Sequence, residues 1–390
     1  MKRKVSVIIS ILFAVFVIFG GVFLANFEDF IDWKQINDDR ITQQEKLDFE
    51  SRLNTKTFYY YNNLSSEQQQ AYIMIYSMFS NFTNSRRLEV TEDELKELFV
   101  AVLYDNSEFF WVDINYTFVD YGTSIEFSPK YRFDSSTAEK MSETLDEKIN
   151  EIVKGAENFA TDYEKELYFH DCVCDLTVYN EETFGEMGDT AYSALIDGEA
   201  ICEGYSRAMQ LLLDKVGISN YLVVGDGVNE DGTEAHMWNI VKIDGKNYHL
   251  DATWNDTGAE NNIGYLYFNV NDEFISRDHI NLVPENNNCV SMEANYFVVN
   301  NLYVESFKNY DELVSPVAIE LQKGDNIVEI LFADETQLAK AMKTLENNNY
   351  AFFDFVGDAV KKSGKDLQKN EIEYYTIDEC NYLCLIFKEG

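Results

Sequence analysis

Three residues of this 390-residue chain have the types and the order that chemistry on an amide through a thiol requires: Cys202, His236 and Asp251. A cysteine thiolate is a strong nucleophile, an imidazole can act as general base and acid, and a carboxylate can fix the imidazole tautomer. Covalent catalysis through a thioester is therefore the leading hypothesis. The alternative is that Cys202 is a small core residue, as most unpaired cysteines are.

Cys202 lies at the predicted amino end of a helix. Apolar residues recur behind it with helical period as far as Val216, and Gly217 is a typical residue for the end of a helix. The unsatisfied N–H groups and the macrodipole of a helix amino end favour negative charge, and the same N–H groups can bind an oxyanion. This position would favour the nucleophilic thiolate.

The histidine and the aspartate are predicted to lie on one hairpin. Residues 236–243 and 246–251 flank Asp244-Gly245, a pair that suits a two-residue type I′ turn. In that register His236 and Asp251 are diagonal neighbours on the same face, ~7–8 Å apart at Cα. If the cysteine helix packs against this face, the hairpin brings the base and its orienting carboxylate to the nucleophile.

The other histidines are expected to have structural roles. His249 is a competing base because it shares the face of His236, but it lies nearer the turn and is expected to be packed or solvent-facing. His170 and His279 have no carboxylate at a telling spacing. No pair of Cys and His has the usual spacing of zinc ligands, so neither a metal nor a cofactor is predicted.

These motifs resemble the transglutaminase-like cysteine enzyme superfamily, whose core is papain-like. The resemblance covers about residues 160 to 260, and stretches 105–111 and 268–273 are similar to membrane-bound or secreted bacterial members. Its three motifs occur in the order Gly198-x-x-x-Cys202-x-Gly204-Tyr205, His236-x-Trp238-Asn239 and Tyr248-x-x-Asp251-x-Thr253-Trp254-x-Asp256.

The resemblance implies a role for each motif residue. Cys202 would be the nucleophile, His236 the base and Asp251 the orienter. It also implies a side-chain oxyanion donor upstream of the cysteine, for which Tyr192 is a candidate. Trp238 and Trp254 are expected to line the site.

The family also bounds the activity, because its members include protein cross-linkers, proteases, deglycosylating amidases and inert scaffolds. We expect acyl transfer on protein or peptide amides, with hydrolysis slightly preferred. The alternatives are protein-glutamine transamidation and a non-catalytic cell-surface binding module.

The net charge of the chain limits the classes of molecule that it can bind. Asp and Glu number 69 against 31 Lys and Arg, so the formal net charge is −38. Such a surface repels phosphate backbones, which makes nucleic acid a very poor partner, and it attracts basic substrates. The 46% hydrophobic and 15% aromatic content indicates a globular protein.

The amino terminus predicts a membrane anchor. Lys2, Arg3 and Lys4 precede Val5–Ala25, an apolar run of 21 residues that is long enough to span a bilayer. By the positive-inside rule the N-terminus is cytoplasmic and the catalytic region extracytoplasmic. A signal peptide cleaved near Ala25-Asn26 is the alternative.

The fold class is predicted as α+β. The expected parts are a membrane anchor, a stalk, an N-terminal α+β region without catalytic residues, the catalytic domain, and a C-terminal accessory domain, over residues 1–26, 27–45, 46–160, 161–303 and 315–390.

Within these parts we predict specific elements. Helices should begin at Ser65-Ser66 and Thr91, and an antiparallel pair should flank Tyr121-Gly122-Thr123. The C-terminal part reads as a β-β-α-β-β unit, with strands at 317–321, 327–332, 372–375 and 382–387 and a helix over 335–362.

Overall fold

A computed structural model describes residues 41–229, 232–259, 262–324, 326–347 and 349–389. The chain divides into two compact units, one of residues 1–242 and 281–285 and one of residues 243–280 and 286–390. The predicted domain boundaries stay predictions. The predicted anchor and most of the stalk lie outside the described residues. No helix within the described ranges is long and apolar enough to cross a membrane.

From residue 41 on, where the described part of the chain starts, four helices lie in the N-terminal part of the first unit. Capping boxes formed by Thr42, Ser65 and Thr91 start three of them, because each side chain accepts a backbone N–H three residues on while a Glu or Gln reaches back. This confirms the predicted starts at Ser65-Ser66 and Thr91. The helices are α2 (Gln43–Glu50), α3 (Tyr59–Asn62), α4 (Ser66–Asn81) and α5 (Glu92–Asp105).

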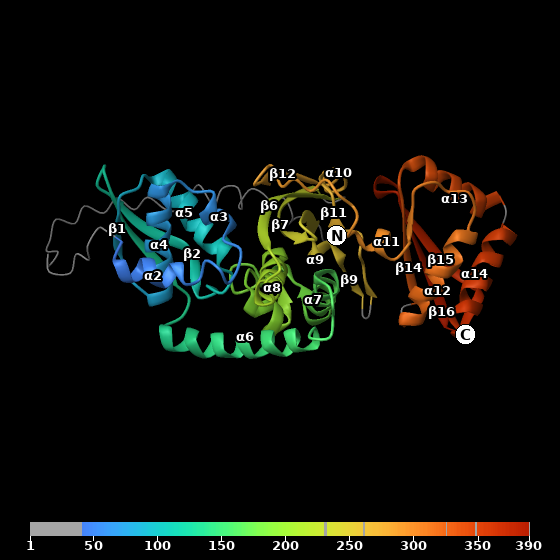
Figure 1. Ribbon diagram of the computed structural model, residues 1–390, viewed down its shortest axis with the longest axis horizontal. Coiled ribbons are helices and arrows are strands. Elements are labelled where there is room, and N and C mark those ends of the chain that lie inside the picture. The colour runs from blue at the N-terminus through green and yellow to red at the C-terminus, as the bar shows by residue number, and fades with distance from the viewer. Residues whose placement is uncertain (1–40, 230–231, 260–261, 325, 348, 390) are drawn as a thin grey trace, which may run out of the picture. The chain divides into compact units, whose positions relative to one another are not determined.

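A three-stranded sheet packs with these helices (Figure 1). Its order is β1-β3-β2 and its pairings are antiparallel, with β1 at Arg86–Leu88, β2 at Val112–Asp120 and β3 at Ile125–Tyr131. The predicted antiparallel pair is thus confirmed. Phe79, Phe99 and Phe127 are buried and stack edge-on or tilted, which joins the helices to the sheet.

The rest of the first unit leads to the predicted nucleophile. Two helices, α6 (Ser135–Gly155) and α7 (Asp162–Leu176), precede a short parallel pair of β4 (Val178–Tyr179) and β5 (Glu199–Ala200). Helix α8 (Cys202–Lys215) follows, and Gly217 has a φ of +76°, the left-handed conformation that ends many helices. The helix is therefore where the sequence predicts it.

Strands β6 (Asn220–Asn229) and β7 (Gly232–Ile243) complete the site region of this unit. They pair antiparallel, with Leu222 opposite Asn239, Val224 opposite Met237 and Gly225 opposite His236. Figure 1 shows α8 beside these strands.

The second unit starts at the predicted turn. Asp244 and Gly245 both have positive φ, 50° and 79°, as a type I′ turn requires, and β8 (Lys246–Leu250) follows them. Strand β8 pairs antiparallel with β11 (Phe268–Val270). Between and after them lie α9 (Ala252–Asn255), β9 (Asp256–Ala259), β10 (Asn262–Ile263), α10 (Asp272–Ile275), β12 (His279–Val283) and α11 (Tyr296–Val299).

The C-terminal part of this unit corrects the predicted β-β-α-β-β order. Residues 317–321 are not a strand but part of helix α12 (Val314–Lys323), in which Val317 and Leu321 bury one face four residues apart. A short apolar run has no periodicity that separates strand from helix, and Pro316 is tolerated in a first helical turn.

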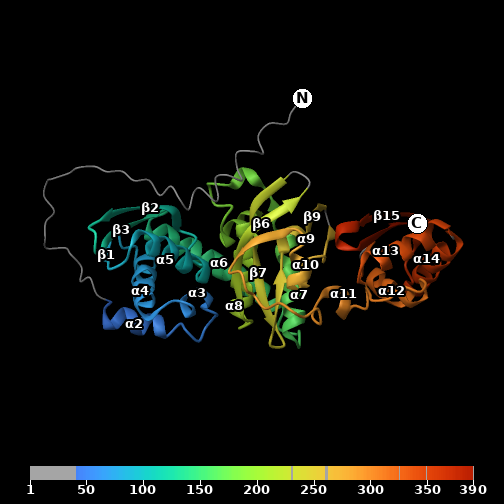
Figure 2. The same cartoon turned by 90° about the horizontal axis from the view of Figure 1, so that it is seen from above.

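The remaining elements of this part are close to the prediction. Strand β14 (Ile327–Phe332) occupies the predicted range, and the predicted long helix is two helices, α13 (Glu335–Asn347) and α14 (Asn349–Ser363). Residue 348, which separates the two helices, lies outside the described residues. Strands β15 (Leu367–Ile377) and β16 (Tyr382–Glu389) join β13 (Tyr303–Val304) and β14 in a four-stranded sheet of order β13-β14-β16-β15. Figure 2 shows β15 together with α12, α13 and α14 in this part of the chain.

Candidate active site

Cys202 is the first residue of α8, preceded by the extended residue Ile201. Its side chain is nearly buried, with 8% exposure. The N–H groups of a first helical turn have no partners within the helix, so they are available to a negative charge or an oxyanion. The predicted position of the thiol at a helix amino end is confirmed.

A glycine makes this helix start possible. A Cβ on Gly204 would lie 2.5 Å from the carbonyl oxygen of Gly188 and 2.6 Å from the Cβ of Ala200, closer than real contacts allow. The Gly188 carbonyl also accepts a hydrogen bond from the Ile201 N–H at 3.0 Å. The loop at residue 188 can therefore lie against the first turn of α8, next to the thiol, only because residue 204 has no side chain.

Two polar side chains attach the start of α8 to β7. The hydroxyl oxygen of Ser206 lies 2.9 Å from the carbonyl oxygen of Cys202 and 2.8 Å from that of Met237. The side-chain amide of Asn239 donates to the carbonyl oxygen of Ser206 at 3.0 Å. All of these groups are buried, so the bonds hold the helix end on the strand that carries His236.

The thiol lies in a small apolar cluster. Cys202 packs with Leu222 and Met237, and Tyr104 and Val224 cover the cluster. Met237 follows His236 on β7, and consecutive side chains of a strand point to opposite sides of its backbone. Cys202 thus packs against β7 at Met237, the residue next to His236, and contact between the thiol and the imidazole stays a prediction.

The His236 side chain is also nearly buried, with 6% exposure. Its ring lies over the ring of Trp238, 5.8 Å between centroids and 22° from parallel. Trp238 has no exposed surface, so it supports the imidazole rather than presenting a surface to substrate.

Buried charges surround the amino end of α8. Glu203 is buried next to the thiol; burial raises its pKa to about 7, while nearby Arg207 and Arg132 oppose that shift. Arg132 forms a bidentate ion pair with Asp189. Glu203 is therefore a proton donor or acceptor near neutral pH, a property that its sequence position did not predict.

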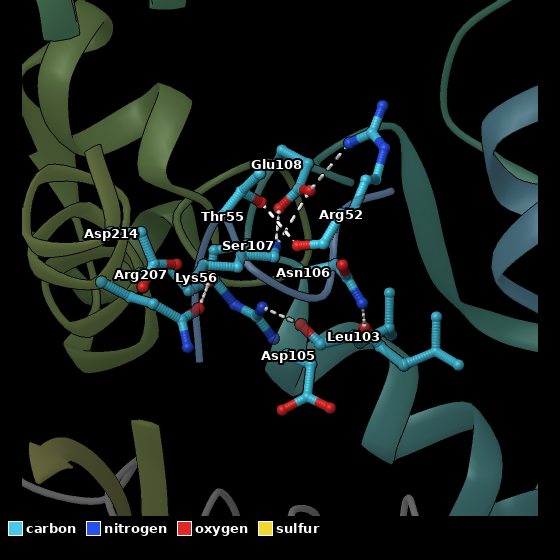
Figure 3. Close-up of polar contacts among 12 residues, drawn as sticks. Arg52, Thr55, Lys56, Leu103, Asp105, Asn106, Ser107, Glu108, Arg207 and Asp214 are labelled. Carbon is cyan, nitrogen blue, oxygen red and sulfur yellow. Dashed lines mark hydrogen bonds and ion pairs between the residues drawn. The ribbon is translucent and has the colours of Figure 1, made fainter. Parts of the chain in front are cut away.

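The N-terminal region contributes a wall of the site, although no functional residue was predicted there. The guanidinium of Arg207 donates to the carbonyl oxygen of Leu103 at 2.8 Å, and Gln210 donates to that of Tyr104 at 3.0 Å and pairs with the hydroxyl of Ser107. Figure 3 shows Arg207 meeting this segment. These contacts fix Tyr104 against Cys202. The stretch 105–111 follows Tyr104 directly, but its similarity to bacterial members of the superfamily indicated no role at the site.

Two more buried acids, Asp105 and Asp214, lie where the segment around residues 103–108 meets α8 (Figure 3). We call this region the junction. Burial raises the pKa of Asp105 to about 6, although the N–H groups of Tyr60 and Tyr61 and the hydroxyl of Tyr72 stabilise its charge. Burial likewise raises the pKa of Asp214 to about 7. The junction therefore takes up or releases protons near neutral pH.

Asp251 lies in the second unit, as the N-cap residue of α9. Its Oδ1 accepts the N–H groups of Thr253 at 2.9 Å and Trp254 at 3.1 Å. Its Oδ2 lies 3.0 Å from Nε2 of His279, and neither side chain has exposed surface. The expectation that His279 lacks a partner carboxylate is wrong, because the two residues are 28 positions apart in the chain and meet only in the fold.

Trp254 takes part in this pocket. Its ring centroid lies 4.4 Å from that of His279, and Tyr267 covers the same imidazole at 5.4 Å. The two aromatic rings exclude water from the pair formed by Asp251 and His279, so the hydrogen bond between them is stronger than in solvent.

His249 occupies a different pocket, where it is fully buried. Its Nε2 lies 2.9 Å from Oδ1 of Asp272, whose Oδ2 accepts the N–H of Cys289 at 2.9 Å. His249, Asp272 and Cys289 each offer one atom that could bind a metal ion, and these three atoms lie within 4.8 Å of one another. The hydrogen bonds among them already account for their positions, as a clamp between β8 and the segment that follows β12.

Tyr192 precedes a short π-helical segment, Ser193–Asp197, and its ring packs 5.4 Å from that of Phe110. Among the contacts of the described residues, the tyrosine against Cys202 is Tyr104. A role for Tyr192 as an oxyanion donor therefore stays a prediction.

The six cysteines all lie in the described part of the chain, and no disulfide joins them. Cys172 is partly exposed and the other five are buried.

Residues 149–252 match the family model described as "Transglutaminase-like superfamily". No curated protein matched the chain. Among solved structures, a "TGase" is 15% identical, with a TM-score of 0.26, over 45% of this chain and 53% of the other.

Two further structures are bacterial. A candidate cysteine protease from Cytophaga hutchinsonii is 11% identical, with a TM-score of 0.24, over 36% of this chain and 61% of that one. A candidate protease from Parabacteroides distasonis is 11% identical, with a TM-score of 0.22, over 36% of each chain. The chain thus spans less than two thirds of each of these structures. Residues 149–252, which contain Cys202, His236 and Asp251, form a transglutaminase-like domain.

Proposed function

We propose that this protein transfers acyl groups from protein or peptide amides through a thioester on Cys202, with water as the preferred acceptor. The observation that carries the proposal is the position of Cys202 at the amino end of α8, attached by Ser206 to the strand of His236.

In the first step the Cys202 thiolate attacks the amide carbon, and the C–N bond breaks. The amine leaves with a proton from the His236 imidazolium, and the N–H groups at the start of α8 stabilise the oxyanion. In the second step His236 takes a proton from water, the resulting hydroxide attacks the thioester, and the C–S bond breaks. The acid is released and the thiol recovers its proton.

In this proposal Asp251 fixes the tautomer of His236 and stabilises its charged form. The three bonds that Asp251 accepts, from Thr253, Trp254 and His279, are compatible with this role, because a carboxylate can accept about four hydrogen bonds.

The nucleophile is tested with a thiol-reactive amide mimic on the full chain. We expect labelling to be lost in Cys202→Ala and retained in Cys172→Ala, a matched control because Cys172 is partly exposed and burial raises its pKa. Equal labelling of the wild type and Cys202→Ala would remove the basis of the proposal.

The acceptor is tested with a glutamine-containing protein and a labelled primary amine. A net charge of −38 attracts both basic substrates and lysine acceptors, so charge does not choose between water and an amine. Amine incorporation that depends on Cys202 and outpaces amide cleavage would replace hydrolysis by cross-linking and leave the nucleophile unchanged.

We also propose that the protein is held in a membrane by Val5–Ala25, with the catalytic region outside the cell. The support is the apolar run of 21 residues behind Lys2, Arg3 and Lys4. Protease added outside intact cells should digest a membrane-bound chain. A soluble mature form that begins near Asn26 would contradict the uncleaved anchor.

A further inference from the structure

The imidazole of His279 contacts a carboxylate on each side. Its Nε2 lies 3.0 Å from Oδ2 of Asp251, and its Nδ1 lies 2.6 Å from Oδ1 of Asp278. Asp278 is itself held, because its Oδ2 accepts the hydroxyl of Tyr267 at 2.5 Å. The chain of contacts runs from Tyr267 through Asp278 and His279 to Asp251.

The proton count of this chain follows from its acceptors. An ionised carboxylate can only accept hydrogen bonds, so each ring nitrogen of His279 must donate one. A histidine that donates from both nitrogens is an imidazolium. Burial alone would lower the pKa of His279, but the hydrogen bonds to Asp251 and Asp278 outweigh burial and raise the pKa above its usual value.

The positive charge matters because Asp251 is fully buried. A buried carboxylate without a cationic partner tends to become protonated, and a protonated Asp251 would lose the negative charge that stabilises the charged form of His236 in the proposed triad. The backbone N–H groups of Thr253 and Trp254 orient Asp251 but carry no net charge.

We propose that His279 is a positioning residue: as a buried imidazolium it keeps Asp251 ionised and fixes the oxygen that orients His236. The inference rests on the proposed function for the last of these roles, whereas the charge state of His279 can be tested without it. A loss of the imidazolium proton at high pH would remove one of the two bonds and weaken the hold on Asp251.

Several side chains of the second unit contact His279. Asp251 and Asp278 lie on its two nitrogens, and Trp254 and Tyr267 cover its ring. The positive charge of His279 also acts on His249, because it is one of the causes that lower the pKa of His249. The two carboxylates therefore dominate the titration of His279.

The charge state is measured by ¹⁵N NMR of the full chain labelled at its four histidines. Loss of a signal in His279→Gln and in His249→Gln assigns both rings. We expect imidazolium shifts for His279 at pH 7 and neutral shifts for His249. In Asp278→Asn the His279 signal should titrate at lower pH. A neutral His279 at pH 7 in the wild type would overturn the inference.

The positioning role is measured by the rate at which iodoacetamide alkylates Cys202 as a function of pH. We expect the midpoint of that profile to rise by about one pH unit in His279→Gln, which is about tenfold slower alkylation below the midpoint. The matched variant His249→Gln should keep the wild-type midpoint. If both variants keep it while His236→Ala shifts it, the triad stands and the role of His279 is wrong. If His236→Ala also leaves it unchanged, the proposed function fails instead.

Discussion

Two buried histidines of the second unit lie in matching settings, yet their pKa values are shifted in opposite directions. His279 and His249 both have no exposed surface at the side chain, and each has Nε2 about 3 Å from an aspartate oxygen. His279 has a second carboxylate, that of Asp278, on its other nitrogen, and its pKa is raised. Burial dominates at His249 and lowers its pKa.

The comparison shows that one hydrogen-bonded carboxylate does not offset the burial of an imidazole here, whereas two do. Exposure of the partner contributes, since the side chain of Asp272 is 47% exposed while that of Asp251 is fully buried. A solvated carboxylate is screened and attracts a cation less strongly. The same pair of residue types therefore disfavours the charged imidazole in one pocket and favours it in the other.

The largest effect should follow from removing the shared partner. Asp251→Ala leaves the His279 charge buried beside one carboxylate and deletes the cap of α9, so we expect the free energy of unfolding to fall by about 3–5 kcal/mol. Urea unfolding at pH 6 measures it. If Asp251→Ala and Asp272→Asn lowered the free energy of unfolding by similar amounts, Asp251 and Asp272 would contribute equally to stability, which would contradict the comparison.

Asp278→Asn should have a smaller effect. It replaces a charged acceptor by a neutral one of the same shape and leaves Asp251 in place, so we expect a loss of about 1–3 kcal/mol at pH 6. The loss should shrink in a background that already carries His279→Gln. Equal losses in both backgrounds would mean that Asp278 acts through Tyr267 and not through the imidazole.

The two histidines should give opposite pH dependences of stability. The folded-state pKa of His279 lies above its usual 6.5, so its contribution is fully present below that pH and is lost as the pH rises through the folded value. The folded-state pKa of His249 lies below 6.5, so its contribution is present above that pH and is lost as the pH falls.

The measurement is the difference in free energy of unfolding between wild type and each Gln variant, from pH 5 to 9. Differences are needed because three buried acids also make the free energy of unfolding depend on pH. The pKa values of Asp105, Asp214 and Glu203 are raised to about 6, 7 and 7, so their contribution to that free energy is lost as the pH rises to those values. Slopes of the same sign for His279→Gln and His249→Gln would contradict the comparison.

The smallest effect should come from Asp272→Asn. Its carboxylate is half-exposed and its partner His249 is neutral, so we expect a loss below about 1 kcal/mol. The asparagine oxygen can still accept the N–H of Cys289. Thermal unfolding at pH 7, with His249→Gln as the companion variant, measures it, and a loss of several kcal/mol would reveal a charged His249.

What the sequence predicted depended on short-range signals. The capping residues Ser65 and Thr91, the pair Asp244-Gly245 and the glycine after α8 are local, and the elements they predict are confirmed. The position of Cys202 at a helix start followed from the same kind of signal.

The parts that the sequence did not predict depend on contacts between distant segments. Tyr104 reaches Cys202 from 98 positions upstream, and His279 reaches Asp251 across 28 residues, without a spacing that marks either pair. The strand predicted at 317–321 was wrong for another reason, since five apolar residues in a row fit a buried strand and a buried helix equally well.

The most direct test of the proposed chemistry is the pH profile of Cys202 alkylation by iodoacetamide in the wild type and in His236→Ala. If the imidazolium of His236 stabilises the thiolate, the wild type should be alkylated rapidly well below pH 7, and the profile of His236→Ala should move up by one or more units, about tenfold or more in rate at low pH. Superimposable profiles for the two folded proteins would show that Cys202 and His236 do not act together, and would contradict the central claim.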